Sequence, residues 1–261
     1  MFQITPSGSA VDCVANDNAF RICFNDPNQG IASAQYIAQN DVAKKVAVIY
    51  DSSDVYSSGI FDKFVAEAEE QGLEIVAKEA FTSDAKTDFS VQLQKVKESG
   101  AELVFLPIYY QEAALILAQA DKAGIDNVKW FGCDGLDGII NQLGDDAALA
   151  EGVMLLTPFA ADAEDDLTQN FVKAYKEKYG VIPNQFAADA YDAAYAIKAA
   201  VEQAEVKDGT ISTSDLCEKL KAAMLKITVD GVTGSMTWTA DGEPTKDPKA
   251  MVIKDGAYSA L

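Results

Sequence analysis

The chain has 261 residues, 49% of them hydrophobic and 24% charged, which is typical of a globular protein with one large or two modest domains. Forty-one acidic against 21 basic side chains give a net charge of −20, which argues against nucleic acid and anionic membrane surfaces as partners. The sequence contains no histidine, which excludes Ser-His-Asp triads, Cys-His dyads and His-ligated zinc.

Four cysteines are spread along the chain without a C-x-x-C pair, which argues against a zinc ribbon or a thioredoxin-like site: Cys13, Cys23, Cys133 and Cys217. A disulfide between Cys13 and Cys23 is possible, but buried free thiols are favoured. The apolar runs are no longer than a strand, so we expect no segment that spans a bilayer. The first residues also lack the basic and apolar regions of a signal peptide.

The first elements predicted are a strand over 2–5, a strand over 19–24 and a helix from Pro27. Asp26 suits the N-cap of that helix because its carboxylate can accept from a free backbone N–H, and proline is favoured at the first helical position.

From residue 45 a strand–helix rhythm begins. Runs rich in β-branched and aromatic residues start 25 to 29 residues apart, at 46–50, 73–81, 102–107, 128–132 and 153–157. Amphipathic helical patterns fill most of the gaps, and glycines such as Gly72 and Gly100 follow the helical patterns. This alternation with short loops predicts parallel βαβ units, and therefore the α/β class.

After residue 158 the pattern changes to consecutive helices, predicted over 165–179, 184–204 and 214–225. A β-pair of 234–239 with 250–254 is predicted next, joined by the stretch 240–247. The late helices carry large apolar faces, and two early strands give them little sheet to cover. The sequence therefore indicates a second α/β domain with too few strands.

Templates for catalysis are missing from the sequence. It contains no G-x-G-x-x-G, no P-loop, no G-x-S-x-G and no H-E-x-x-H. We therefore predict no catalytic residue, no metal site and no cofactor, and a protein that is not an enzyme.

A binding edge is predicted on physical grounds, because ligands of open parallel sheets bind outside the carboxyl ends of the strands. Those ends carry Tyr56, Tyr109 and Asp134 followed by Gly135. Aromatic rings with one carboxylate suit a small cationic or zwitterionic ligand. Each residue also has a structural explanation: packing for the tyrosines, and a helix cap or turn for Asp134.

Several stretches, in order along the chain, resemble one protein family. They are 4–10 (ITPSGSA), 20–24 (FRICF) followed by Gln29-Gly30, 46–51 (VAVIYD) with Tyr56 and Gly59, 88–90 (DFS) and 237–242 (TWTADG). The chain resembles type I periplasmic solute-binding proteins of ABC transporters, in the branch that binds leucine, isoleucine and valine.

The resemblance implies two doubly wound α/β lobes with a ligand cleft and hinge closure. Lobe two would be 25–157 plus 233–261, and lobe one would be 1–24 plus 158–232, missing its first βα units. The chain would thus be a C-terminal fragment.

The resemblance also implies the ligand residues. Ser7 and Ser9 would hold a carboxylate, Tyr56 and Tyr109 would close on the ligand, Asp134 with Gly135 would take the α-amine, and Phe186 would form an apolar wall. Family members in the branched-chain branch use glutamate where this sequence has Asp134.

The implied function is the extracytoplasmic solute-binding component of an ABC importer, for an amino acid or similar zwitterion. Its partners would be this ligand and the permease subunits, without a membrane-spanning segment of its own. It would act in a periplasm, or as a cell-surface lipoprotein in a Gram-positive bacterium. The alternatives are the ectodomain of a ligand-sensing receptor with this fold and, less favoured, a βα enzyme of unassigned chemistry.

Overall fold

The structure is a computed structural model that describes residues 1–207, 209–246 and 248–261. The chain divides into two compact units. Unit 1 comprises Met1–Asn25 and Pro158–Lys249, and unit 2 comprises Asp26–Thr157 and Ala250–Leu261. Each unit is described by itself.

Unit 2 is built on a seven-stranded sheet. Its strands are β3 (Lys45–Asp51), β4 (Glu74–Phe81), β5 (Leu103–Leu106), β6 (Lys129–Gly132), β7 (Met154–Thr157), β10 (Lys249–Lys254) and β11 (Ala257–Ala260). β3 to β7 pair in parallel, whereas β10 and β11 form an antiparallel pair at one edge. The strand–helix rhythm of the sequence is therefore confirmed as parallel βαβ units.

The strand order of this sheet is β11-β10-β7-β6-β5-β3-β4. Counted from β3, the parallel strands stand in the order 2-1-3-4-5, which is a doubly wound arrangement. The chain reverses its winding direction between β3 and β5. In sheets of this kind, ligands bind outside the carboxyl ends of the strands at the point where the winding direction reverses.

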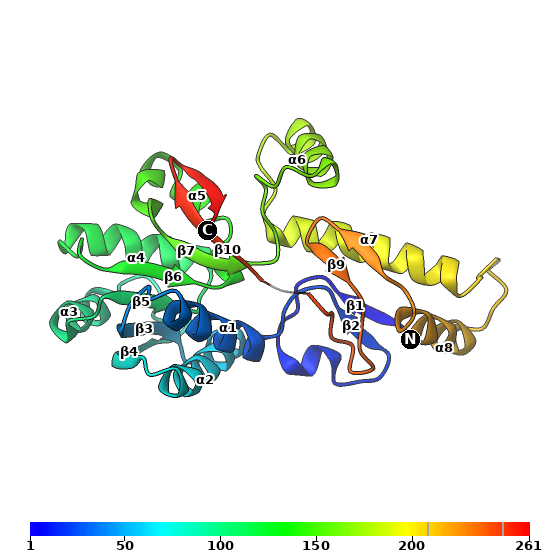
Figure 1. The fold of residues 1–261 in the computed structure, drawn as a ribbon, viewed down its shortest axis with the longest axis horizontal. Coiled ribbons are helices and arrows are strands. Elements are labelled where there is room, and N and C mark those ends of the chain that lie inside the picture. Colours follow the sequence, from blue (N-terminus) through cyan, green and yellow to red (C-terminus); the bar gives the residue numbers. More distant parts are fainter. Residues whose placement is uncertain (208, 247) are drawn as a thin grey trace. The chain divides into compact units, whose positions relative to one another are not determined.

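Helices flank this sheet (Figure 1). They are α1 (Asp26–Gln39), α2 (Val55–Glu70), α3 (Ser90–Ser99), α4 (Tyr110–Lys122) and the short α5 (Ile139–Leu143), with 3₁₀ turns η2 (Asp134–Leu136) and η3 (Gly144–Ala150). α1 and α2 pack on one face of the sheet, where Phe64 stacks on Phe105 of β5 with ring centres 3.9 Å apart. Alternate residues of the same strands, such as Ala47 and Val104, point to the other face and are fully buried.

Unit 1 contains two sheets of two strands each among its described residues. The parallel pair β1 (Gln3–Thr5) and β2 (Ala19–Arg21) is joined by the 3₁₀ turn η1 (Val11–Val14), and the antiparallel pair β8 (Val229–Gly231) and β9 (Gly234–Met236) is a separate sheet. The helices α6 (Asp166–Tyr179), α7 (Gln185–Gln203) and α8 (Thr213–Met224) lie within one residue of the predicted bounds. Asp165, Asn184 and Ser212 cap their N-termini.

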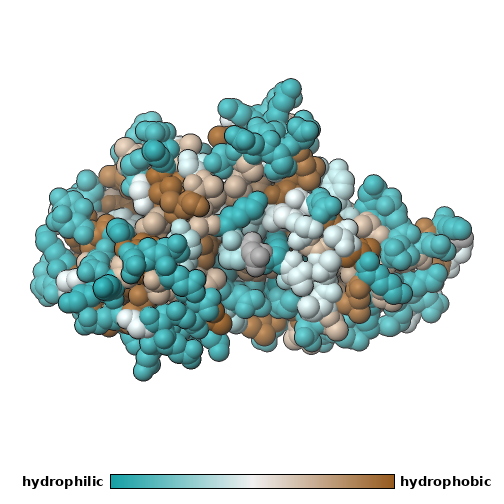
Figure 2. Space-filling model, in the orientation of Figure 1, coloured by the Kyte–Doolittle hydropathy of each residue, from teal (hydrophilic) through white to brown (hydrophobic). Residues whose placement is uncertain are grey.

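The core of unit 1 joins α7 and α8 to the short strands. Phe20 and Ile22 from the β2 region pack with Ala196 of α7, Leu220 of α8 and Trp238. Part of the helical apolar surface stays exposed, including Tyr195, 46% exposed, and Ile197, 40% exposed. Apolar atoms interrupt the hydrophilic surface near α7 in Figure 2. This agrees with the shortage of strands inferred from the sequence.

The predicted β-pair of 234–239 with 250–254 is wrong. β9 pairs with β8, two residues before it, and β10 pairs with β11 in the other unit. A tight turn at Val232 and Thr233 makes the first hairpin because Asp192 of α7 accepts hydrogen bonds from both backbone N–H groups, each at 2.9 Å. Asp247, the last residue of the predicted connection, lies outside the described residues.

The predicted boundary at residue 233 also differs from the division of the structure, which falls after Lys249. Residues after the β8–β9 hairpin stay with unit 1 because Trp238 is buried in its core and donates a 2.7 Å hydrogen bond to the backbone oxygen of Arg21. The other two divisions between the units fall after Asn25 and after Thr157.

The cysteines are free thiols, with Cys13 half-buried and Cys23, Cys133 and Cys217 buried. Among the described residues, none of the helices combines the length and apolarity needed to cross a bilayer.

Candidate functional site

The tyrosines predicted from the sequence lie at the carboxyl edge of the unit 2 sheet. Tyr56 is the second residue of α2, which follows β3, and Tyr109 directly precedes α4, which follows β5. These two strands flank the point where the winding direction reverses. The rings stack with centres 4.7 Å apart and planes tilted by 22°.

Asp134 meets Tyr56 at the end of the next strand. The Tyr56 hydroxyl donates a 2.7 Å hydrogen bond to Oδ1 of Asp134 and accepts a 2.9 Å hydrogen bond from the backbone N–H of Gly135. Four predicted residues, Tyr56, Tyr109, Asp134 and Gly135, are therefore brought together in unit 2. The phenol is a bridge that holds the carboxylate and the η2 turn in a fixed arrangement.

Burial sets the chemistry of this bridge. Tyr56 is 5% exposed and Asp134 is 4% exposed, and burial raises the pKa of the Tyr56 phenol well above its usual value, with the charge of Asp134 adding to the effect. The phenol therefore keeps its proton and donates a hydrogen bond to the carboxylate. Burial also raises the pKa of Tyr109, which is 38% exposed and presents the open side of the stacked pair.

Gly135 is required by its surroundings. A Cβ at this position would lie 2.5 Å from the Tyr56 hydroxyl oxygen and 2.6 Å from the backbone oxygen of Ile108. Contacts of this length are repulsive, so only glycine lets the η2 turn approach the strand end and the tyrosine this closely.

Gln29 of α1 also contacts this group, although the sequence analysis did not predict it as a site residue. Its side-chain oxygen accepts from the backbone N–H of Asp134 at 3.4 Å, and the residue is 4% exposed. It lies 105 positions before Asp134, and a glutamine in the first turn of a helix carries no distinctive signal. Only the fold could reveal this contact.

Other acidic residues at the same edge have structural partners. Asp51 accepts hydrogen bonds from Ser53 and Ser83, which lower its pKa against the opposing effect of burial. Asp54 caps α2, and Asp84 is exposed. Asp137 is buried beside the Tyr258 hydroxyl. Within the described residues no three acidic or cysteine side chains are grouped so as to hold a metal ion.

The residues predicted in unit 1 lie on a loop and a helix. Ser7 is half-buried, and Ser9 is buried in the loop that follows β1. The guanidinium of Arg21, fully buried, donates to the backbone oxygens of Gly8 at 2.9 Å and Ala10 at 3.0 Å, and so fixes the shape of this loop. Phe186 is half-buried in the first turn of α7.

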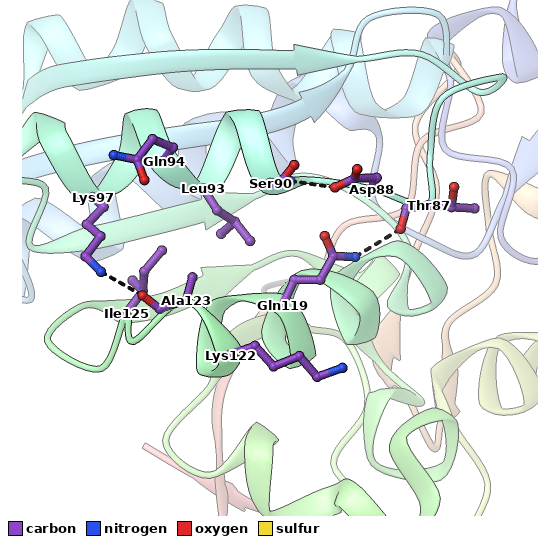
Figure 3. A pocket seen from close by; sticks show the side chains of 10 residues that line it. All are labelled: Thr87, Asp88, Ser90, Leu93, Gln94, Lys97, Gln119, Lys122, Ala123 and Ile125. Atoms are coloured by element: carbon purple, nitrogen blue, oxygen red, sulfur yellow. Dashed lines mark hydrogen bonds between the residues drawn. The ribbon is translucent and has the colours of Figure 1, made fainter.

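A separate groove of about 500 Å³ lies between α3 and α4 of unit 2 (Figure 3). Two of its polar side chains bond to the backbone across it: Lys97 to the oxygen of Ala123 at 2.7 Å, and Gln119 to the oxygen of Thr87 at 3.0 Å. None of the predicted site residues lines this groove.

Known proteins resemble the chain over most of its length. A Leu/Ile/Val-binding protein homolog of Brucella melitensis is 29% identical over 93% of this chain and 63% of its own length. A leucine-, isoleucine-, valine-, threonine- and alanine-binding protein of Pseudomonas aeruginosa is 27% identical over 93% of this chain and 62% of its own length. The chain therefore spans less than two thirds of these relatives.

Solved structures of binding proteins also resemble the chain. The leucine-binding protein LivK of Thermotoga maritima superposes with a TM-score of 0.84 at 27% identity, covering 99% of this chain and 71% of that one. The branched-chain amino acid transporter substrate-binding protein LivJ of Streptococcus pneumoniae, in complex with isoleucine, gives 0.83 at 28% identity, covering 98% and 70%. The model of the periplasmic binding protein family matches residues 2–257, so the chain belongs to that family.

Proposed function

We propose that this protein is the solute-binding component of an ABC importer and binds an amino acid or a similar small zwitterion. The observation that carries the proposal is the Asp134 carboxylate at the carboxyl edge of the unit 2 sheet, held by Tyr56 beside the stacked ring of Tyr109. The relatives whose names specify leucine, isoleucine and valine support the ligand class.

The chemistry of this arrangement suits an ammonium group. A carboxylate attracts a cation more strongly where burial lowers the local dielectric, and Asp134 is buried. One oxygen of Asp134 accepts a hydrogen bond from the Tyr56 hydroxyl, and the charge of the carboxylate would attract a ligand ammonium. The stacked tyrosines would cover the apolar body of the ligand and add a cation–π attraction.

As part of an importer, this protein would also bind the permease subunits of the transporter. The permease subunits of a transporter would receive the loaded binding protein on the extracytoplasmic side of the membrane, the location that the family implies. The proposed location is a periplasm or, in a Gram-positive bacterium, the cell surface through a lipid anchor. No chemical step of its own is proposed.

The proposal is tested by thermal unfolding of the protein with a panel of leucine, isoleucine, valine, threonine and alanine. A specific rise in Tm with one or more of them is expected, because a ligand that binds the folded state stabilises it. Asp134→Asn should abolish this rise, whereas Asp84→Asn, at an exposed position, should leave it unchanged. Equal rises for the two variants would remove Asp134 from the site. If none of the five amino acids raises the Tm, the proposed function is contradicted.

A further inference from the structure

The turn that carries Asp134 contains two Asp-Gly pairs. Asp134-Gly135 is followed, after one leucine, by Asp137-Gly138, and the stretch lies between β6 and α5 of unit 2. A backbone hydrogen bond of 2.9 Å from the N–H of Asp137 to the oxygen of Asp134 joins the two pairs. Asp134 and Asp137 are each 4% exposed. The two pairs are therefore parts of one buried turn.

A second tyrosine contacts the second pair in the way that Tyr56 contacts the first. Tyr258 lies on β11, and its hydroxyl accepts a 2.8 Å hydrogen bond from the backbone N–H of Gly138. The same hydroxyl donates a hydrogen bond to the carboxylate of Asp137. Burial raises the pKa of the Tyr258 phenol above its usual value, and the charge of Asp137 adds to the effect. This phenol therefore keeps its proton and remains a donor.

The two phenols fix the turn from opposite ends of the unit 2 sequence. Each donates to an aspartate and accepts from the N–H of the glycine that follows it. Tyr56 lies 78 positions before Asp134, and Tyr258 lies 120 positions after Gly138. The η2 turn has only three residues, and 3₁₀ hydrogen bonds are poorer than those of an α-helix. Contacts from outside the turn therefore contribute much of its rigidity.

We propose that Tyr258 is a positioning residue for the amino-acid site, which holds the second Asp-Gly pair so that the Asp134 carboxylate stays in place for the ligand ammonium. The proposal rests on the proposed function and deepens it, because it gives the hairpin of β10 and β11 a role in ligand recognition. Tyr258 acts through Asp137 and its backbone bond to Asp134, and needs no contact with the ligand. A tyrosine that served stability alone would lower the Tm without changing which ligand the folded protein prefers.

The first test measures the preference for a ligand ammonium. Calorimetry gives the dissociation constants of leucine, isoleucine, valine, threonine and alanine, and of the acids that lack their amino groups, such as isocaproate for leucine. Tyr258→Phe should reduce the preference for the amino acid at least about tenfold, the effect of one good hydrogen bond. The matched control is Tyr36→Phe, because Tyr36 packs against Phe131 through its ring. This variant should keep the preference within about threefold of the parent.

The second test needs no ligand and follows hydrogen exchange of single backbone amides by NMR. In Tyr258→Phe the amide of Gly138 loses its acceptor, so its exchange should accelerate whatever the role of the tyrosine. The decisive amide is that of Gly135, which bonds to Tyr56 at the other end of the turn. If Tyr258 positions the whole turn, the exchange of Gly135 should also accelerate at least about tenfold. In Tyr36→Phe it should stay within about threefold of the parent.

The outcomes separate this inference from the proposed function. If Tyr258→Phe keeps the preference of the parent within about threefold, or leaves the exchange of Gly135 unchanged, the inference is overturned while the amino-acid function stands. A parent that binds none of the amino acids contradicts the proposed function, and the inference with it.

Circular dichroism checks that the variants fold. If Tyr258→Phe does not fold, Asp137→Asn tests the same link, because it removes the charge that strengthens the hydrogen bond from Tyr258. It should reduce the preference for the amino acid at least about threefold, and an unchanged preference would overturn the inference.

Discussion

The Tyr56 hydroxyl and the Asp134 carboxylate, 78 positions apart in the chain, are joined by a 2.7 Å hydrogen bond at the carboxyl edge of the unit 2 sheet. The same hydroxyl accepts from the backbone N–H of Gly135. It thus ties the first turn of α2 to the turn after β6. The phenol has both of its hydrogen-bonding roles satisfied within the protein, so its ring is the part that remains for a ligand.

Tyr56→Phe should lower the free energy of unfolding by about 1–3 kcal/mol, since it leaves a buried carboxylate and a buried N–H without the hydroxyl that bridged them. Urea unfolding measures this change. Tyr50→Phe is the matched control: Tyr50 stacks on Phe61 through its ring, so the free energy should change by less than about 0.5 kcal/mol. Equal effects of the two substitutions would show that the hydroxyl bridge adds no stability.

Gly135→Ala adds only one methyl group, but it should lower both the stability of the protein and its binding of amino acids. The new methyl group would overlap the Tyr56 hydroxyl and the backbone oxygen of Ile108, so the turn after β6 must move. We expect a loss of about 1–3 kcal/mol, typical of overpacking, and loss of the stabilisation by amino acids. Gly59→Ala in α2 is the control, because its methyl group would find ordinary contacts at 3.4 Å or more. A Gly135→Ala protein that melts and binds like the parent would refute the close approach.

Arg21, the one arginine in the sequence, is expected to be essential for unit 1. Besides the two loop oxygens, it pairs with Glu243 at 3.2 Å. A lysine keeps the charge but cannot copy the planar fork, so Arg21→Lys should cost about 2–5 kcal/mol of unfolding free energy. The exposed pair of Lys198 with Glu202 serves as control, where Lys198→Met should cost less than about 0.5 kcal/mol. If Arg21→Lys and Lys198→Met give the same denaturant curve, Arg21 is not essential for the stability of unit 1.

Asp165 caps α6 by accepting from the backbone N–H of Thr168 at 2.9 Å, and this bond lowers the pKa of its carboxyl. Asp165→Ala should cost about 0.5–2 kcal/mol at neutral pH. A folded-state pKa below the unfolded one means that the charge-dependent part of this stability is present above about pH 3.8 and is lost as the pH falls through the folded pKa.

The parent and Asp165→Ala melting curves should therefore converge as the pH drops below about 3.8. The exposed residue Asp162, in the same loop, provides a comparison, since Asp162→Ala should differ little from the parent at any pH. A difference that is independent of pH would show that the cap does not act through the carboxylate charge.

Local signals in the sequence were sufficient for most of the fold. Continuous apolar runs such as 46–50 predict buried strands, and capping residues such as Asn184 mark helix starts within a residue. The hairpin of β8 and β9 was missed because each strand has three residues and its turn is held by Asp192, 40 positions earlier. The boundary after Lys249 was missed for the same reason, since the packing of Trp238 depends on residues far away in the chain.

For the candidate site, the sequence could predict the positions of the residues but not the contacts between them. The position of Tyr56, Tyr109 and Asp134 at one edge follows from the rule for parallel sheets, so the sequence could supply it. Their hydrogen bonds could not be predicted, because they depend on side-chain geometry across 78 positions. The same holds for the contacts of Gln29 and Tyr258, across 105 and 120 positions.

The most direct test of the central claim compares each amino acid of the panel with the acid that lacks its amino group, such as leucine with isocaproate. Calorimetry gives the dissociation constant of both for the parent protein and for Asp134→Asn. The parent should bind the amino acid about 30- to 4000-fold more tightly, the cost of about 2–5 kcal/mol for breaking a buried charge pair. Asp134→Asn should lose most of this difference. A parent that binds both ligands equally, or a difference that Asp134→Asn leaves intact, would contradict the account.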